Sequence, residues 1–154
     1  MNELVIPIGM PGCGKTTLIN YRYINSHSIL CLDDIRQAMG SVYNPNIESF
    51  VRAILETMGK AFMIRGVNIV LDSTNTSKYI IEKWLNLSRE YAYNTKLIIF
   101  DIPIEVCKDR QIHSCPSNVF ERFYKQMKET KDWIYSGKFP VEVDIEYQKF
   151  EYIK

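Results

Sequence analysis

The 154-residue sequence predicts an α/β fold in which a parallel sheet carries helices on both faces. Two observations support this fold class. Short apolar runs alternate along the chain with segments whose apolar residues recur at helical spacing. A glycine-rich segment, residues 9–16, lies between the first apolar run and the first helical segment. No linker, repeat or low-complexity segment divides the sequence, so we expect one domain over residues 1–154.

Five segments are predicted to be strands, at residues 3–8, 28–32, 67–71, 96–100 and 141–147. The first four are nearly continuous apolar runs, as in strands that are buried on both faces. The fifth alternates apolar and charged residues, so we expect it to be half exposed. Pro7 lies inside the first strand and has no backbone N–H. We therefore predict that one neighbouring strand lacks a ladder bond at Pro7.

Helices are predicted where apolar residues return every three or four positions. The clearest covers residues 47–62, with Asn46 as its N-cap and Gly66 at its end. Thr76 or Ser77 is expected to cap the helix that follows the third strand. The other helices are expected over residues 16–23, from about residue 33, after Pro103, and from Ser117 to about Lys131.

Residues 9–16 read Gly-Met-Pro-Gly-Cys-Gly-Lys-Thr and match the phosphate-binding pattern G-x-x-x-x-G-K-[ST]. Glycines let several backbone N–H groups turn toward one anion, and the helix N-terminus adds positive partial charge there. Lys15 is predicted to reach the β- and γ-phosphates of ATP, and the Thr16 hydroxyl to bind Mg²⁺. The predicted nucleotide-binding residues are Gly9, Gly12, Cys13, Gly14, Lys15, Thr16 and Thr17.

Asp33, Asp34 and Arg36 follow the second predicted strand, at the edge of the sheet where ligands bind in such folds. A carboxylate can accept the proton of an attacking hydroxyl, and a guanidinium can hold a phosphate bidentately. We therefore predict Asp33 as the general base and Arg36 as the substrate anchor. The alternatives are helix capping by Asp33 or Asp34, and a surface ion pair of Arg36.

Asp72 ends the third predicted strand, where a carboxylate commonly orients the waters on Mg²⁺. Thr16, Asp33 and Asp72 are thus the residues predicted to form the Mg²⁺ site. Asn75 follows in the same loop and is a candidate substrate ligand beside Arg36 and Asp72. Ordinary turn or capping residues are the alternatives for Asp72 and Asn75.

The net charge of +1 indicates that the chain does not coat nucleic acid, so any contact with nucleic acid must be local. Four cysteines without paired C-x-x-C spacing, and only two histidines, argue against a zinc site. We expect reduced thiols and a cytoplasmic location. Neither a signal peptide nor a membrane span is predicted, because the N-terminus lacks a basic segment and no apolar stretch approaches 18 residues.

Together these segments resemble the kinase domain of phage-type 5′-hydroxyl polynucleotide kinases, which are P-loop kinases. The resemblance covers about residues 3–130. It rests on the phosphate loop and on residues 32–37 (LDDIRQ), 71–75 (LDSTN), 100–103 (FDIP) and 119–127 (VFERFYKQM). A related Asp-x-x-Arg pair also occurs in small-molecule kinases such as adenylylsulfate kinase.

The resemblance implies a P-loop kinase-like fold and ATP-dependent transfer of the γ-phosphate to a 5′-hydroxyl end of DNA or RNA. Lys15 and Thr16 would bind ATP and Mg²⁺, and Asp72 would support the metal-bound waters. Asp33 would be the general base, and Arg36 would hold the phosphate 3′ to the accepting hydroxyl. For a viral member the compartment would be the host cytoplasm, and a 3′-phosphatase domain is not expected in this chain.

The lid, expected at about residues 108–118, departs from the family pattern of two arginines four positions apart. Arg110 matches the first arginine and is a predicted catalytic residue, but Ser114, next to His113, stands at the second position. Lys108 and Arg122 are therefore further candidates for the charge that stabilises the transition state.

Two other functions stay open. One is a kinase of a small molecule, such as a nucleoside, a nucleotide-like acceptor or an alcohol. The other is a nucleotide-switched binding protein, against which Asp33 and Arg36 argue because a switch needs no acceptor anchor. Lys125, Lys128 and Lys131 recur at helical spacing. They are candidates for contacts to a nucleic-acid backbone, with a solvated helix face as the alternative.

Overall fold

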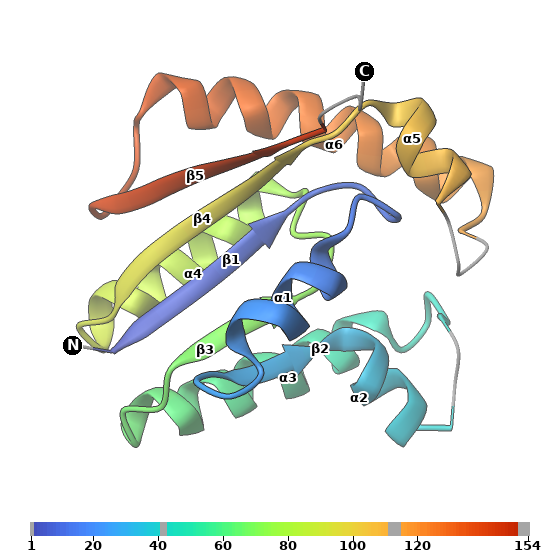
Figure 1. Ribbon diagram of the computed structural model, residues 1–154. Coiled ribbons are helices and arrows are strands. Elements are labelled where there is room, and N and C mark those ends of the chain that lie inside the picture. The colour runs from blue at the N-terminus through green and yellow to red at the C-terminus, as the bar shows by residue number, and fades with distance from the viewer. Residues whose placement is uncertain (1, 41–42, 111–114, 151–154) are drawn as a thin grey trace.

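The structure, a computed structural model, describes residues 2–40, 43–110 and 115–150. Its strands form one all-parallel sheet in the order β2-β3-β1-β4-β5, which confirms the predicted α/β class (Figure 1). The strands are β1 (Glu3–Ile8), β2 (Ser28–Cys31), β3 (Ile69–Asp72), β4 (Asn94–Asp101) and β5 (Val143–Lys149).

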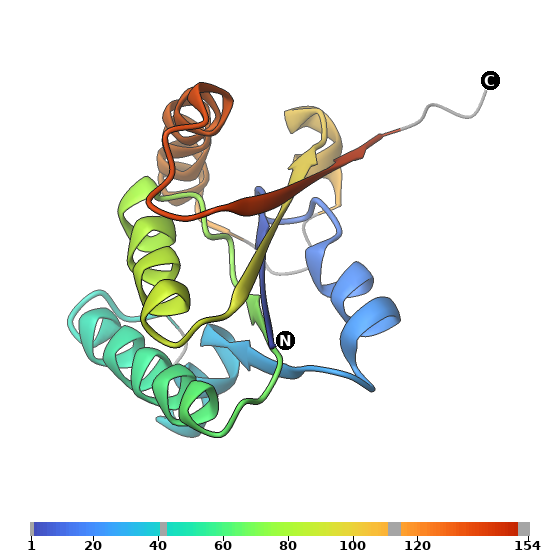
Figure 2. The ribbon, with the colours of Figure 1, turned by 90° about the vertical axis from the view of Figure 1, so that its left-hand side faces the viewer.

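Helices cover both faces of this sheet, as predicted. Figure 2 shows α3, α4 and α6 on one side and α1 and α5 on the other. Within the described ranges the helices are α1 (Lys15–Tyr23), α2 (Leu32–Ala38), α3 (Glu48–Ile64), α4 (Lys78–Glu90), α5 (Ile104–Asp109) and α6 (Ser117–Ser136). None of these helices is both long enough and apolar enough to cross a membrane.

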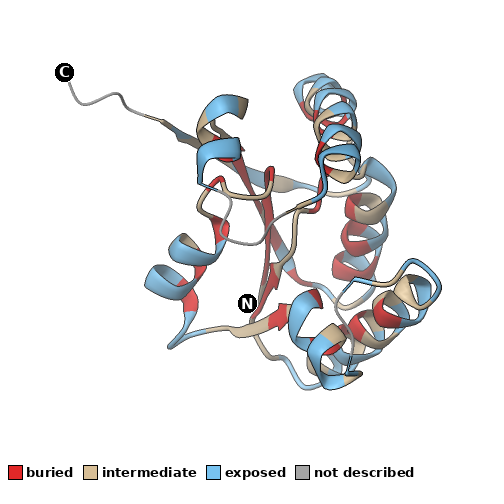
Figure 3. Cartoon of the chain, turned by 90° about the vertical axis from the view of Figure 1, so that its right-hand side faces the viewer, coloured by how far each residue is buried: buried red, intermediate tan, exposed pale blue. Residues whose placement is uncertain are grey.

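The core lies along the central strands. Figure 3 shows the buried residues gathered there and on the helix faces that meet the sheet. The largest fully buried side chains are aliphatic and come mostly from β1, β3 and β4, namely Leu4, Ile6, Ile8, Ile69, Leu71, Leu97, Ile98 and Ile99. β5 alternates between half-buried and exposed positions at the sheet edge, so its predicted half exposure is confirmed.

Pro7 interrupts the sheet on one side only. The β1–β4 ladder runs through Pro7, which pairs with Ile98, whereas the β1–β3 ladder covers only Leu4 and Val5. The Pro7 carbonyl accepts a hydrogen bond of 2.8 Å from Nδ2 of Asn75, a residue in the loop after β3. The predicted gap in one ladder is therefore confirmed, and a side-chain amide takes the place of a strand neighbour at this point.

Helix starts differ from the predictions in detail. Asn46 is not the N-cap of α3, because Ile47 holds that position and a turn from Asn44 to Ile47 precedes the helix. Ser117 is the first residue of α6 rather than its cap, and the helix continues beyond Lys131 to Ser136. Ser77 is the cap residue of α4, although its side chain makes no capping hydrogen bond.

Candidate active site

The carboxyl ends of β1, β2 and β3 and the N-termini of α1 and α2 meet at one edge of the sheet (Figure 1). The phosphate loop lies there between β1 and α1. Gly12 and Gly14 have φ angles of 82° and 101°, which side chains with a Cβ rarely adopt. A Cβ on Gly9 would lie 2.5 Å from Sγ of the buried Cys13 and 2.9 Å from Cβ of Phe100. Glycine is therefore required at all three predicted positions for a geometric reason.

Lys15 opens α1 and is buried, with 8% of its surface exposed. Its ammonium donates hydrogen bonds to the carbonyls of Gly9 (2.8 Å) and Met10 (2.9 Å) and lies 3.5 Å from the Cys13 sulfur. The loop itself thus holds the positive charge at its centre. Phosphate oxygens at this position would replace carbonyl partners by anionic ones, which strengthens each hydrogen bond.

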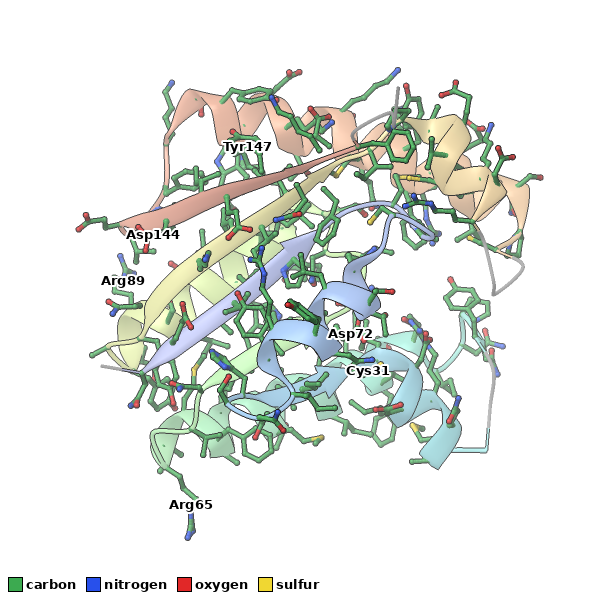
Figure 4. All side chains as sticks on the ribbon, viewed as in Figure 1. Cys31, Arg65, Asp72, Arg89, Asp144 and Tyr147 are labelled. Carbon is green, nitrogen blue, oxygen red and sulfur yellow. The ribbon has the colours of Figure 1, made fainter. Side chains whose placement is uncertain are left out.

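Thr16 and Asp72 join the phosphate loop to the end of β3. The Thr16 hydroxyl lies 3.2 Å from both carboxylate oxygens of Asp72, while Thr17 follows as an exposed residue of α1. Figure 4 shows Asp72 beside Cys31, its register partner at the end of β2. A hydroxyl and a carboxylate side by side fit the oxygen ligands that Mg²⁺ requires, so the residues present suit this metal.

The charge around Asp72 also suits a cation. Burial raises the pKa of the Asp72 carboxyl, and the nearby Asp33 and Asp34 carboxylates raise it further, against the lowering effects of the Thr16 hydrogen bond and the Lys15 charge. Three carboxylates therefore face one region of the edge, and a divalent cation would relieve their repulsion. Metal binding by Asp33 itself stays a prediction.

Asp33 and Arg36 form an ion pair on α2. Nη1 of Arg36 lies 2.5 Å from Oδ1 of Asp33, whose side chain is 69% exposed. Asp33 stands in the first turn of α2, and Cys31 holds the N-cap position without a side-chain capping bond. The geometry thus favours a carboxylate that faces solvent and the edge of the sheet over a helix-capping one.

Glu48, at the start of α3, is a second partner of Arg36 that sequence reasoning missed. Its carboxylate accepts from Nε of Arg36 at 3.1 Å and from Nη2. Burial lowers the pKa of Arg36, but the Glu48 and Asp33 carboxylates together outweigh this effect and the net shift is upward. Arg36 is therefore held in one orientation and stays charged. Because its side chain is only 16% exposed, it does not form the surface ion pair that the sequence left open as an alternative.

Asn75 is built into the loop after β3. Only 6% of it is exposed, and its amide donates to the carbonyls of Pro7, Leu71 and Ser73. The Ser73 hydroxyl donates to its Oδ1 at 2.8 Å. These contacts give Asn75 a positional role between β1 and β3, and its contact with substrate stays a prediction.

The lid is only partly described. Arg110 is the C-cap residue of α5, and its guanidinium carbon lies 5.3 Å from the centre of the Phe150 ring. His113 and Ser114 lie outside the described residues. Lys108 forms an exposed ion pair with Glu121 at 3.8 Å. The catalytic roles proposed for Arg110 and Lys108 therefore stay predictions.

The three lysines of α6 are not equally available to a ligand. Lys131 Nζ donates to Oδ1 of Asp101 at 2.7 Å, and Lys128 Nζ lies 4.3 Å from the centre of the Tyr124 ring. Lys125 is exposed. Because two of the three contact neighbouring side chains, the contacts favour the solvated-face interpretation over a track for nucleic acid.

Comparison with known proteins identifies the family to which the chain belongs. A family model described as an AAA domain matches residues 4–129. The chain belongs to the AAA domain family. No curated protein sequence matches this AAA domain protein.

Solved structures show what this AAA domain protein is similar to. A chain in the Pnkp1/Rnl/Hen1 RNA repair complex is 24% identical with a TM-score of 0.74, over 86% of this chain and 46% of that one. A putative kinase from Chloroflexus aurantiacus is 15% identical with a TM-score of 0.67, over 96% and 88% of the two chains. The Mycobacterium tuberculosis APS kinase CysC, in complex with AMPPNP and APS, is 12% identical with a TM-score of 0.62, over 99% and 90%.

These likenesses confirm the P-loop kinase fold. At such identities they show the fold alone, and the AAA domain protein spans about half the length of the repair-complex chain. The function of the chain must therefore be inferred from the chemistry of the site.

Proposed function

We propose that this AAA domain protein is an ATP-dependent phosphotransferase that moves the γ-phosphate of ATP to the 5′-hydroxyl end of DNA or RNA. The phosphate loop supplies Lys15 and backbone N–H groups to the ATP phosphates. Thr16 and Asp72 are the residues that would hold Mg²⁺, which offsets charge on the phosphates when bound. Asp33 takes the proton of the attacking hydroxyl.

The observation that carries this proposal is the Arg36 cluster. Arg36 is joined to Asp33 at 2.5 Å and is clamped by Glu48, so a proton acceptor and a fixed cation stand side by side. Guanidinium has five N–H donors, and these bonds engage all three nitrogens with one hydrogen each. Two hydrogens are left for an oxyanion. An acceptor that carries a hydroxyl and a phosphate on one nucleoside offers a partner to each of these two groups.

The comparisons support the proposal without deciding it. One similar structure comes from an RNA repair complex, which favours a nucleic-acid acceptor. Another is an APS kinase, which favours a small-molecule acceptor. The two acceptors differ in one testable respect, because only a nucleic-acid end must carry a phosphate 3′ to the accepting nucleoside.

The test compares a nucleoside with its 3′-monophosphate as acceptors of γ-labelled phosphate. We expect the 3′-monophosphate to be preferred by roughly 10- to 1,000-fold in kcat/KM, because one charge-assisted contact to Arg36 is gained. Arg36→Ala should erase most of this preference. Arg89→Ala is the matched control, since Figure 4 places Arg89 at the far end of the molecule from Asp72. Equal use of the two acceptors by the unmutated protein would refute the polynucleotide assignment and favour a small-molecule kinase.

A further inference from the structure

A cleft of about 250 Å³ lies beside the loop that follows β3. Arg52 of α3 and Arg122 of α6 line it, with Phe123 of α6 and with Thr74 and Ser77 of the loop. The lining includes two cations and several hydroxyl or amide groups but no carboxylate. Such a lining is complementary to an anion with an attached apolar or aromatic group.

Nearby carboxylates do not fully neutralise the positive charges of these two arginines. The carboxylate nearest to Arg52 is that of Glu48, at 4.0 Å, and Glu48 is already bound to Arg36 on two nitrogens. Within the described part of the chain, Arg122 forms no ion pair, and its guanidinium carbon lies 5.5 Å from the centre of the Phe123 ring. Burial lowers the pKa of Arg52, and the charges of Arg36 and Arg122 add to this effect. One anion placed between Arg52 and Arg122 would relieve that repulsion.

Two contacts link residues that line the cleft to the reacting site. The carbonyl of Thr74 accepts a 3.1 Å hydrogen bond from the N–H of Gly9, the first residue of the phosphate loop. Arg52 and Arg36 both pair with the same carboxylate oxygen of Glu48. A ligand whose first phosphate is held by Arg36 would therefore reach the cleft with its next anionic group.

We propose that this cleft binds the second phosphate of a 5′-hydroxyl strand, with Arg52 and Arg122 as its ligands and Phe123 beside the adjoining base. The inference rests on the proposed function and deepens it, because it makes the acceptor a chain of at least two nucleotides. A nucleoside monophosphate needs a single anchor, whereas this edge offers a second one. Cations beside an aromatic ring are the common means of holding single-stranded nucleic acid.

The experiment measures kcat/KM for two acceptors that differ by one phosphate-linked nucleotide, a nucleoside 3′-monophosphate and the corresponding dinucleotide 3′-monophosphate. We expect the unmutated protein to prefer the dinucleotide by roughly tenfold or more, the usual effect of one charge-assisted contact. Arg122→Gln should reduce this preference to about threefold or less. Arg122→Lys should retain part of it, because lysine keeps the charge but lacks the paired N–H donors of a guanidinium. Lys128→Gln, on the exposed face of the same helix, should leave the preference unchanged.

Two results would overturn the inference. One is a preference near unity in the unmutated protein while both acceptors are phosphorylated, which would leave the proposed function intact. The other is an equal loss for both acceptors in Arg122→Gln, which would place Arg122 on the transferred phosphoryl group. If no 5′-hydroxyl acceptor were phosphorylated at all, the proposed function would fail and this inference with it. Melting temperatures of the variants check that each one is folded.

Discussion

At the scale of single residues, Asp33 is the group whose chemistry and structural role can be separated most cleanly. Its carboxylate is 69% exposed, and its ion-pair partner on the same helix is Arg36. An ion pair three residues apart on a helix, with a mostly exposed carboxylate, contributes only a few tenths of a kcal/mol to stability. Asp33 therefore has little to do with holding α2 in place, which leaves its carboxylate available for proton transfer.

Asp33→Asn should lower kcat by roughly 10²-fold or more, because the amide cannot accept a proton at neutral pH. The melting temperature should change little. Single-turnover transfer of labelled phosphate and thermal unfolding measure the two effects. Asp144→Asn is the matched control, since it removes the same charge at an exposed position that Figure 4 shows far from Asp72. A large loss of stability with a modest kinetic loss would identify Asp33 as a structural residue instead.

Asp72 differs from Asp33, because its negative charge destabilises the folded protein. Burial raises the pKa of its carboxyl above that of an unfolded aspartate, so its ionised form destabilises the folded state at neutral pH. Asp72→Asn should therefore stabilise the protein by on the order of 1 kcal/mol while abolishing transfer. Urea unfolding at neutral pH measures the stability. A lower unfolding free energy in the variant would mean that the Thr16–Asp72 contact outweighs the cost of burial.

At the scale of elements, β5 pairs with β4 along its whole length, and one carboxylate on β5 adds ion pairs to two neighbouring elements. Glu146 accepts from Arg22 of α1 at 2.7 Å and pairs with Lys96 of β4 at 2.9 Å. Burial alone would raise the pKa of Glu146, but hydrogen bonds from Lys96, Arg22 and Gln148 lower it to about 2. Because the pKa is depressed in the folded state, this stabilisation is complete above the unfolded value of about 4.5 and is lost as the pH falls toward about 2.

Glu146→Gln should therefore destabilise the protein by about 1 kcal/mol near neutral pH, the scale of a partly exposed ion-pair network. The difference in unfolding free energy between the variant and the unmutated protein should shrink steadily below about pH 4.5. Denaturant unfolding at several pH values between about 3 and 7 measures it. Asp144→Asn, two residues away on the same strand and exposed, should show no such convergence. The same difference in unfolding free energy at every pH would contradict the role given to the Glu146 charge.

The elements also show why some features were predictable and others were not. Apolar runs such as β1 and β3 are local signals, and so are the phosphate loop and the Asp33–Arg36 spacing, because the residues concerned are close in sequence. Glu48 reaches Arg36 from another helix, across a loop, and no local pattern marks it. Arg52 was missed because a basic residue between apolar ones on a helix ordinarily faces solvent. The position of β1 between β3 and β4 likewise depends on pairings between residues far apart in sequence.

At the scale of the whole molecule, the proposed function joins distant segments through the nucleotide. The phosphate loop follows β1, its metal-side partner Asp72 ends β3, and the Lys15 ammonium is held by the carbonyls of Gly9 and Met10. A ligand that bridges these segments binds only the folded chain. It must therefore stabilise the entire domain against unfolding.

MgATP at about 100 times its dissociation constant should stabilise the protein by about 2.7 kcal/mol, which for a domain of this size corresponds to roughly 5–10 °C in melting temperature. Lys15→Ala should abolish most of this shift without lowering the melting temperature of the ligand-free protein much, because Lys15 acts on charge rather than on core packing. Removal of Mg²⁺ with a chelator should reduce the shift, and Asp72→Asn should make it insensitive to the chelator. This measurement needs no acceptor, so it tests nucleotide binding separately from the polynucleotide assignment. An undiminished shift in Lys15→Ala would show that the phosphate loop does not hold the ATP phosphates, whatever the acceptor is.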